Sequence, residues 1–198
     1  ALRTGAAEGC RAEISSTGEL RAALAAGFGG PDCLYTGPGK TTGEIREAIA
    51  HGVRLFSTDS VTDVDRVGAV AAEQDAVAQC LLRVNSAAAS ATTSIRMTGV
   101  PSQFGFDSET LPEILPRLLR VRGAHVAGLH FFPLSNARDE ESLAGEFEHT
   151  IGIAATLARD LGLPLRHLDI GGGFAAPYAV PGDRGAYPGL RHRLSVAL

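Results

Sequence analysis

The chain of 198 residues contains no tryptophan, a single methionine, three cysteines and only 6% aromatic residues. Its cysteines, Cys10, Cys33 and Cys80, are odd in number and far apart, which argues against a disulfide framework or a clustered metal site and favours a reducing cytoplasm. A net charge of −4 with so few aromatic side chains argues against a nucleic-acid partner. No apolar run is long enough to span a bilayer and no signal peptide is visible, so we expect no membrane partner.

Methionine and lysine are each present once, and both carry information. The sequence begins at Ala1 and its methionine is Met97, so we expect a fragment of a longer protein. The lysine, Lys40, lies in the stretch TGPGKTT, which is similar to a phosphate-binding loop. A nucleotide loop of the Walker type needs a glycine at position 34, where this chain has Leu34, and Pro38 lacks an amide N–H group. We therefore exclude an ATP or GTP site and expect a turn before a helix that Thr41 and Glu44 begin with a capping box.

Short apolar runs alternate with longer amphipathic segments along the whole chain. The apolar runs lack a period of two, as expected for buried parallel strands, and the amphipathic segments have helical spacing, capping residues or both. The predicted strands are 12–15, 33–36, 53–57, 77–84, 125–132 and 165–170, and the predicted helices are 17–26, 44–51, 61–73, 110–121, 140–161 and a final one from 190. This order predicts an α/β fold with a parallel sheet. Periodicity alone leaves open whether the sheet is doubly wound or part of an eight-stranded barrel.

Polar residues and glycines follow several of these predicted strands, at the edge where parallel α/β folds place their sites. Three glycines, Gly171–Gly173, follow the last strand, and successive glycines let backbone N–H groups approach an oxyanion closely. Arg83 ends the fourth strand and His130 lies in the fifth. Each feature alone has a structural explanation, but their shared location favours a binding site.

Five motifs in this order resemble the fold-type III pyridoxal-phosphate (PLP) decarboxylases, the group of diaminopimelate, ornithine and arginine decarboxylases. They are Gly37-Pro38-Gly39-Lys40-Thr41, Leu82-Arg83-Val84, Ser102-Gln103-Phe104-Gly105-Phe106-Asp107, Gly128-Leu129-His130 and Leu168-Asp169-Ile170-Gly171-Gly172-Gly173-Phe174. The resemblance covers residues 9–174. It implies a PLP-binding (β/α)8 barrel of the TIM type, of which residues 1–198 would supply strands two to seven, without the C-terminal β domain of the family.

The same resemblance implies what the residues do. In the family a lysine at the end of strand one forms the Schiff base with PLP, and this strand is not expected in residues 1–198, so no catalytic residue is assigned here. The implied PLP-binding residues are Glu13, Arg83, His130, Phe132, Ser135, Gly171, Gly172 and Gly173. Lys40 would lie on a turn outside the cofactor pocket, unburied, and would react with PLP only slowly, like a free amine. The implied partners are a small amino-acid substrate and a second copy of the chain in a homodimer.

Two single positions depart from the family pattern, and so does Leu134-Ser135-Asn136, which stands where the family usually has Gly-Ser-Gln. Gln103 stands where the family usually has lysine, and Phe132 stands where a histidine often stacks on the PLP ring. Phenylalanine can stack but cannot hydrogen-bond or carry charge. The sequence therefore leaves two hypotheses: decarboxylation of an amino acid or an amino-acid derivative by the intact enzyme, or a PLP-binding barrel without catalysis, which these two substitutions favour slightly. An unrelated phosphate-binding barrel is a third, which the ordered motifs disfavour.

Overall fold

The computed structural model describes residues 1–85, 104–177, 181–182 and 185–198. Its strands are β1 (Ala12–Ile14), β2 (Cys33–Tyr35), β3 (Leu55–Thr58), β4 (Ala78–Asn85), β5 (Phe106–Asp107), β6 (Ala124–His130) and β7 (His167–Asp169). Its helices are α1 (Leu2–Ala7), α2 (Thr17–Ala26), the 3-10 turn η1 (Gly30–Asp32), α3 (Thr42–Ala50), α4 (Val61–Glu73), α5 (Leu111–Leu118), α6 (Glu140–Leu161) and α7 (Leu190–Ala197).

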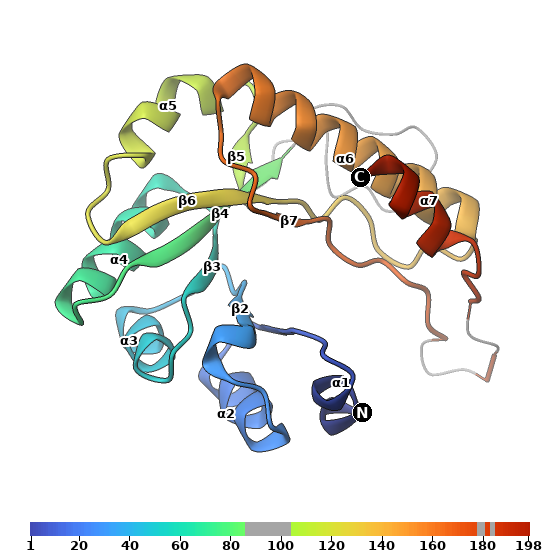
Figure 1. Ribbon diagram of the computed structural model, residues 1–198, viewed down its shortest axis with the longest axis horizontal. Helices are drawn as coiled ribbons and strands as arrows, with labels where there is room; N and C mark the ends of the chain where they lie inside the picture. The colour runs from blue at the N-terminus through green and yellow to red at the C-terminus, as the bar shows by residue number, and fades with distance from the viewer. Residues whose placement is uncertain (86–103, 178–180, 183–184) are drawn as a thin grey trace.

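Six strands form one curved parallel sheet in the order β1-β2-β3-β4-β6-β7, and the short β5 pairs with the end of β4. Helices α2 to α6 follow the strands along the outer side of this curve, so the sheet encloses a concave inner side (Figure 1). This is a parallel half-barrel, as the sequence predicted, and the spatial order of strands excludes the doubly wound alternative, in which the strand order reverses. The main core packs the sheet against the helices and includes fully buried Phe56, Val64, Leu82 and Leu129.

Side-chain caps begin four of the described helices. Ser16 and Ser60 accept backbone N–H groups at the starts of α2 and α4, and Asp139 does so for α6. Thr41 and Glu44 form the predicted capping box of α3. Helix α6 ends at Gly162, whose left-handed backbone (φ 62°) closes the last turn.

The predicted helices 17–26, 61–73 and 140–161 have the bounds found in the structure, and the six predicted strands are all present, mostly shorter by one to three residues. Three elements were not predicted: α1, η1 and β5. Ser102 and Gln103, which belong to one of the five motifs, lie outside the described residues. No helix in the described part of the chain is long and apolar enough to cross a membrane.

Candidate active site

The inner side of the half-barrel presents side chains in rows that run across neighbouring strands. Arg83 on β4, His130 on β6 and Asp169 on β7 are in-register partners. Residues in register on parallel strands project to the same face of the sheet. These three polar side chains therefore form one row at the carboxyl edge of the strands, where sites in β/α barrels lie. Two residues earlier along each of these strands, the in-register partners are Leu81, Gly128 and His167.

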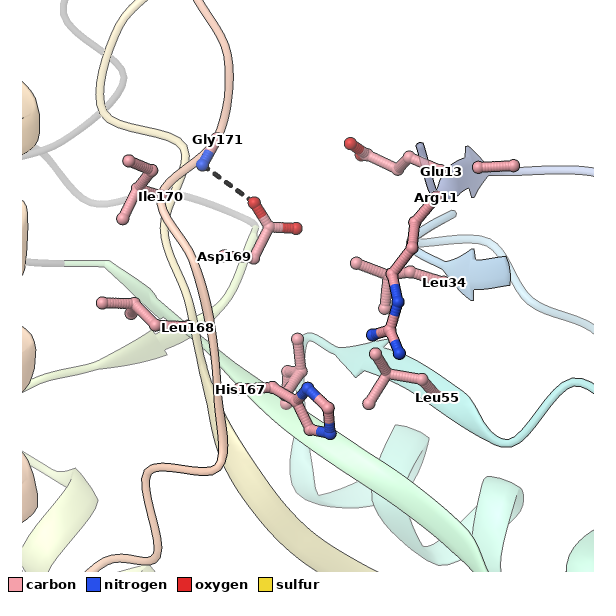
Figure 2. Close-up of a pocket in the computed structure, with 11 residues that line it drawn as sticks. Arg11, Glu13, Leu34, Leu55, His167, Leu168, Asp169, Ile170 and Gly171 are labelled. Atoms are coloured by element: carbon pink, nitrogen blue, oxygen red, sulfur yellow. Dashed lines mark hydrogen bonds between the residues drawn. The ribbon is translucent and has the colours of Figure 1, made fainter. Parts of the chain in front are cut away.

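A cavity of about 350 Å³ lies between the two edge strands, β1 and β7. Arg11 and Glu13 line it on the β1 side, and His167, Asp169 and Gly171 line it on the β7 side. Figure 2 shows Glu13 pointing across the cavity toward β7, and Asp169 pointing from β7 toward β1. Of the eight predicted cofactor-binding residues, Glu13 and Gly171 line this cavity directly. Its walls carry both charge signs above an apolar floor formed by Leu34, Leu55 and Leu81.

The predicted glycine loop, Gly171–Gly173, leaves β7 at the top of the cavity. Gly171 and Gly173 have left-handed backbones (φ 74° and 109°), which side chains rarely tolerate. A Cβ atom on Gly173 would come within 2.6 Å of the Leu134 side chain, whereas one on Gly172 would meet no atom within 4 Å. The loop therefore packs closely on one side and leaves open space at Gly172. Such a cradle of backbone N–H groups suits a phosphate group.

The segment after β6 lies beside this loop and contains the predicted Phe132 and Ser135. A Cβ atom on Gly171 would come within 3.1 Å of the Phe132 ring, so the ring and the loop are neighbours. Phe132 and Ser135 are half-buried. Tyr187 fastens the two segments together, since its hydroxyl donates to the Ala137 carbonyl and accepts from the Ala175 N–H group. The structure thus brings the predicted stacking residue next to the predicted phosphate loop.

His130 is 3% exposed, and its ring lies between Ser57 and Asp169. The Nδ1 atom is 2.6 Å from the Ser57 hydroxyl, and Nε2 is 3.8 Å from an Asp169 oxygen. Burial, with the nearby positive charge of Arg83, lowers the pKa of His130 to about 4, so the ring is neutral at physiological pH. The Asp169 oxygen favours the tautomer with the proton on Nε2, which leaves Nδ1 to accept from Ser57.

This lowered pKa makes the stability of the fold depend on pH. The ordinary pKa of 6.5 belongs to the unfolded chain, which binds a proton between pH 6.5 and about 4 while folded His130 does not. The stability contributed by the neutral, buried ring is therefore fully present above pH 6.5 and is lost as the pH falls toward 4.

Arg83 is held by a carboxylate that the sequence analysis did not select. Its guanidinium lies 3.2 Å from Asp59, which follows β3, and its charge lies 5.1 Å from the centre of the Phe104 ring. Asp59 is 9% exposed, and burial raises its pKa while Arg83 acts in the opposite direction. Asp59 follows a strand directly, so the rule that selected the ends of other strands could have found it.

Lys40 is the clearest correction to the sequence analysis. The predicted unburied lysine is 2% exposed, and its ammonium forms an ion pair of 2.8 Å with Asp63 on α4. It also donates to the backbone carbonyls of Gly37 (2.7 Å) and Ser57 (2.8 Å). The turn folds inward because these three acceptors compensate the charge that burial would otherwise make costly. Lys40 therefore ties the β2–α3 turn to the adjacent strand and helix.

In the described ranges, no group of three His, Cys, Asp or Glu side chains is placed to hold a metal ion. The three cysteines are free, with Cys10 exposed and Cys33 and Cys80 buried.

Comparison with known proteins decides which family this barrel belongs to. A family model described as "Pyridoxal-dependent decarboxylase, pyridoxal binding domain" matches residues 1–185. The chain belongs to this family. The cofactor of the family is pyridoxal phosphate, and the features above fit such a group: a glycine cradle with open space at Gly172, and an aromatic ring, Phe132, beside it.

Curated relatives of this pyridoxal-binding domain are decarboxylases. An L-glutamyl-[BtrI acyl-carrier protein] decarboxylase of Niallia circulans is 26% identical over 86% of this chain and 40% of its own length. A 2-[(L-alanin-3-ylcarbamoyl)methyl]-2-hydroxybutanedioate decarboxylase of Staphylococcus aureus is 30% identical over 84% of this chain and 42% of its own. The chain thus spans less than half the length of these two relatives.

The fold of the domain also matches a solved structure. Diaminopimelate decarboxylase from M. jannaschii, determined in co-complex with L-lysine, superposes with a TM-score of 0.81 at 22% sequence identity. The match covers 99% of this chain and 46% of the other. The half-barrel described here is therefore part of the barrel fold of these enzymes.

Proposed function

We propose that the whole protein removes the α-carboxylate from an amino acid or an amino-acid derivative, and that residues 1–198 form part of its PLP-binding barrel. PLP, when bound, withdraws electrons from the carbon that loses CO2. The observation that carries this proposal is the glycine loop Gly171–Gly173, which lies at the carboxyl edge of the strands beside Phe132. The family assignment supplies the reaction class.

Each predicted residue has a proposed task in this site. The N–H groups of Gly172 and Gly173 in the glycine loop hold the phosphate, and the Phe132 ring packs against the pyridine ring of PLP. Glu13 presents its carboxylate from β1 across the cavity, where it orients the cofactor or the substrate amine. Ser135 lies on the same segment as Phe132 and supplies a hydroxyl at the cofactor.

Arg83 and His130 act from the inner row of the sheet. Arg83, fixed by Asp59, supplies positive charge near the phosphate and the substrate carboxylate. His130 is neutral and held by Ser57, so we assign it a packing and hydrogen-bonding task rather than proton transfer.

A PLP-binding barrel without catalysis is the second candidate, and Lys40 favours it for residues 1–198 alone. Its ammonium is buried and paired with Asp63, so it is not available for covalent attachment of PLP. Phe132 also offers no hydrogen bond at the position where the family often has histidine. On this reading PLP binds and no CO2 is released.

The two candidates separate in one experiment on the whole protein. PLP binding is measured by absorbance titration, and release of labelled CO2 is measured from diaminopimelate, ornithine, arginine, glutamate and a glutamyl thioester, each labelled at the α-carboxylate. Binding with CO2 release from one of these substrates supports the decarboxylase. Binding without release from any of them supports the non-catalytic barrel, and absence of binding contradicts both.

The assembly and location of the protein are also proposals. Family resemblance supports a homodimer with a small amino-acid substrate, and the composition supports a cytoplasmic protein without nucleic-acid or membrane partners. Sedimentation of the whole protein tests the dimer, for which a monomer at micromolar concentration is the contrary result.

A further inference from the structure

Asp169 ends β7, and its two carboxylate oxygens face two different parts of the site. Oδ1 accepts the backbone N–H group of Gly171 at 2.9 Å, the bond drawn in Figure 2. Oδ2 lies 3.8 Å from Nε2 of His130 on the neighbouring strand. The Asp169 side chain is 17% exposed and lines the cavity between β1 and β7. It therefore connects the inner row of the sheet to the first residue of the glycine loop.

The bond from Gly171 has a consequence for the phosphate cradle. Because its N–H group donates to Asp169, Gly171 does not offer that group to an external anion. Among the described residues, no acceptor is found for the N–H groups of Gly172 or Gly173. The loop thus has one N–H group committed within the chain and two that remain for a ligand.

The same bond also stabilises an unusual backbone conformation. Gly171 is left-handed (φ 74°), and a Cβ atom there would come within 2.7 Å of the Phe131 carbonyl oxygen. A turn packed this closely onto the segment after β6 has little conformational freedom once its first N–H group is fixed. The direction of the next two N–H groups follows from that fixed turn.

We propose that Asp169 is a positioning residue, which holds Gly171 so that the N–H groups of Gly172 and Gly173 point at the phosphate of the cofactor. This inference rests on the proposed PLP site. Its chemical requirement is an acceptor oxygen at the Oδ1 position; the negative charge itself opposes a phosphate dianion, and Arg83 in the same row offsets it. An amide oxygen at this place would therefore serve the loop as well as the carboxylate does.

The test compares two ligands and two variants in the whole protein. PLP and pyridoxal, which lacks the phosphate, are titrated against the parent, Asp169→Ala and Asp169→Asn. We expect Asp169→Ala to weaken PLP binding roughly 10- to 100-fold while pyridoxal binding changes by less than about 3-fold. We expect Asp169→Asn, which keeps the acceptor, to bind PLP as tightly as the parent or more tightly. Equal losses for both ligands, no loss, or an Asn variant as weak as the Ala variant would overturn the proposal.

Amide hydrogen exchange in the parent protein tests the same idea without any variant, and so covers the case in which Asp169→Ala does not fold. Gly171 should be protected before PLP is added and unchanged afterwards, whereas Gly172 and Gly173 should gain protection. If Gly171 exchanges freely without PLP, Asp169 does not hold the loop. If the parent does not bind PLP, the proposed function fails, and the protection of Gly171 still decides whether Asp169 fixes the turn.

Discussion

Replacing Lys40 with methionine removes a buried ammonium group while keeping most of the side-chain volume. The ammonium contacts Asp63 at 2.8 Å, the Gly37 carbonyl at 2.7 Å and the Ser57 carbonyl at 2.8 Å. After Lys40→Met, the Asp63 carboxylate, 4% exposed, remains buried without its ammonium partner. Removing one member of a buried pair costs roughly 3–5 kcal/mol of unfolding free energy. Against a typical total of about 5–15 kcal/mol, this loss is large.

The assay is equilibrium urea unfolding of the whole protein followed by circular dichroism, with Arg46→Met as the matched control. Arg46 pairs with Glu73 at 2.7 Å, but both side chains are about half exposed (51% and 57%), so the control should lose less than about 1 kcal/mol. The double variant Lys40→Met/Asp63→Asn should recover part of the loss, because it also removes the buried charge that has lost its ammonium partner. If Lys40→Met lowers the unfolding free energy no more than the control does, the buried Lys40–Asp63 pair does not stabilise the fold as argued.

Three other predictions concern His130, Phe132 and the two edge strands of the sheet. His130→Asn should remove the acid sensitivity that the His130 ring gives to the fold. Between pH 6.5 and about 4, the unfolding free energy of the parent should therefore fall by roughly 2–4 kcal/mol more than that of the variant. Parallel curves of unfolding free energy against pH would count against this prediction. In PLP titrations of the whole protein, Phe132→Ala should lose roughly 0.5–1.5 kcal/mol of binding free energy from stacking, beyond the loss due to buried area. Phe132→His should raise the rate of decarboxylation. If both variants behave like the parent, Phe132 is only a core residue. Among the described strands β1 and β7 each pair on one side only, so residues 1–198 expressed alone should aggregate or oligomerise, and a sharp cooperative melt of a monomer is the contrary result.

The fold was predictable because its signals are local. Apolar runs mark the six strands. Capping residues such as Thr41 and Asp139 mark the starts of helices that follow them directly in the sequence. Helix α1 and strand β5 lack such signals, since α1 has no side-chain cap and no buried residue, and β5 has only two residues. Their formation depends on neighbours that a sequence window does not contain.

The candidate site was predictable only in part. Gly171–Gly173 and Arg83 follow from strand-end position, but the partners that hold them are set by three-dimensional contacts. Asp59 reaches Arg83 from 24 residues away, and Ser57 reaches His130 from 73 residues away. Lys40 was misplaced for the same reason, because the Asp63 carboxylate that stabilises its burial comes from α4, beyond the next helix and strand.

The most direct test of the central claim is the PLP affinity of Gly172→Val beside that of Gly39→Val in the whole protein. A Cβ atom at either glycine meets no atom within 4 Å, and neither has a left-handed backbone, so the two substitutions are matched in their local space. Gly172 lies in the proposed phosphate cradle, whereas Gly39 lies in the TGPGKTT turn that is similar to a phosphate loop in sequence. Our account predicts weakened PLP binding for Gly172→Val, because its side chain blocks close backbone approach, and unchanged binding for Gly39→Val. Loss of PLP binding in Gly39→Val with none in Gly172→Val would contradict the account.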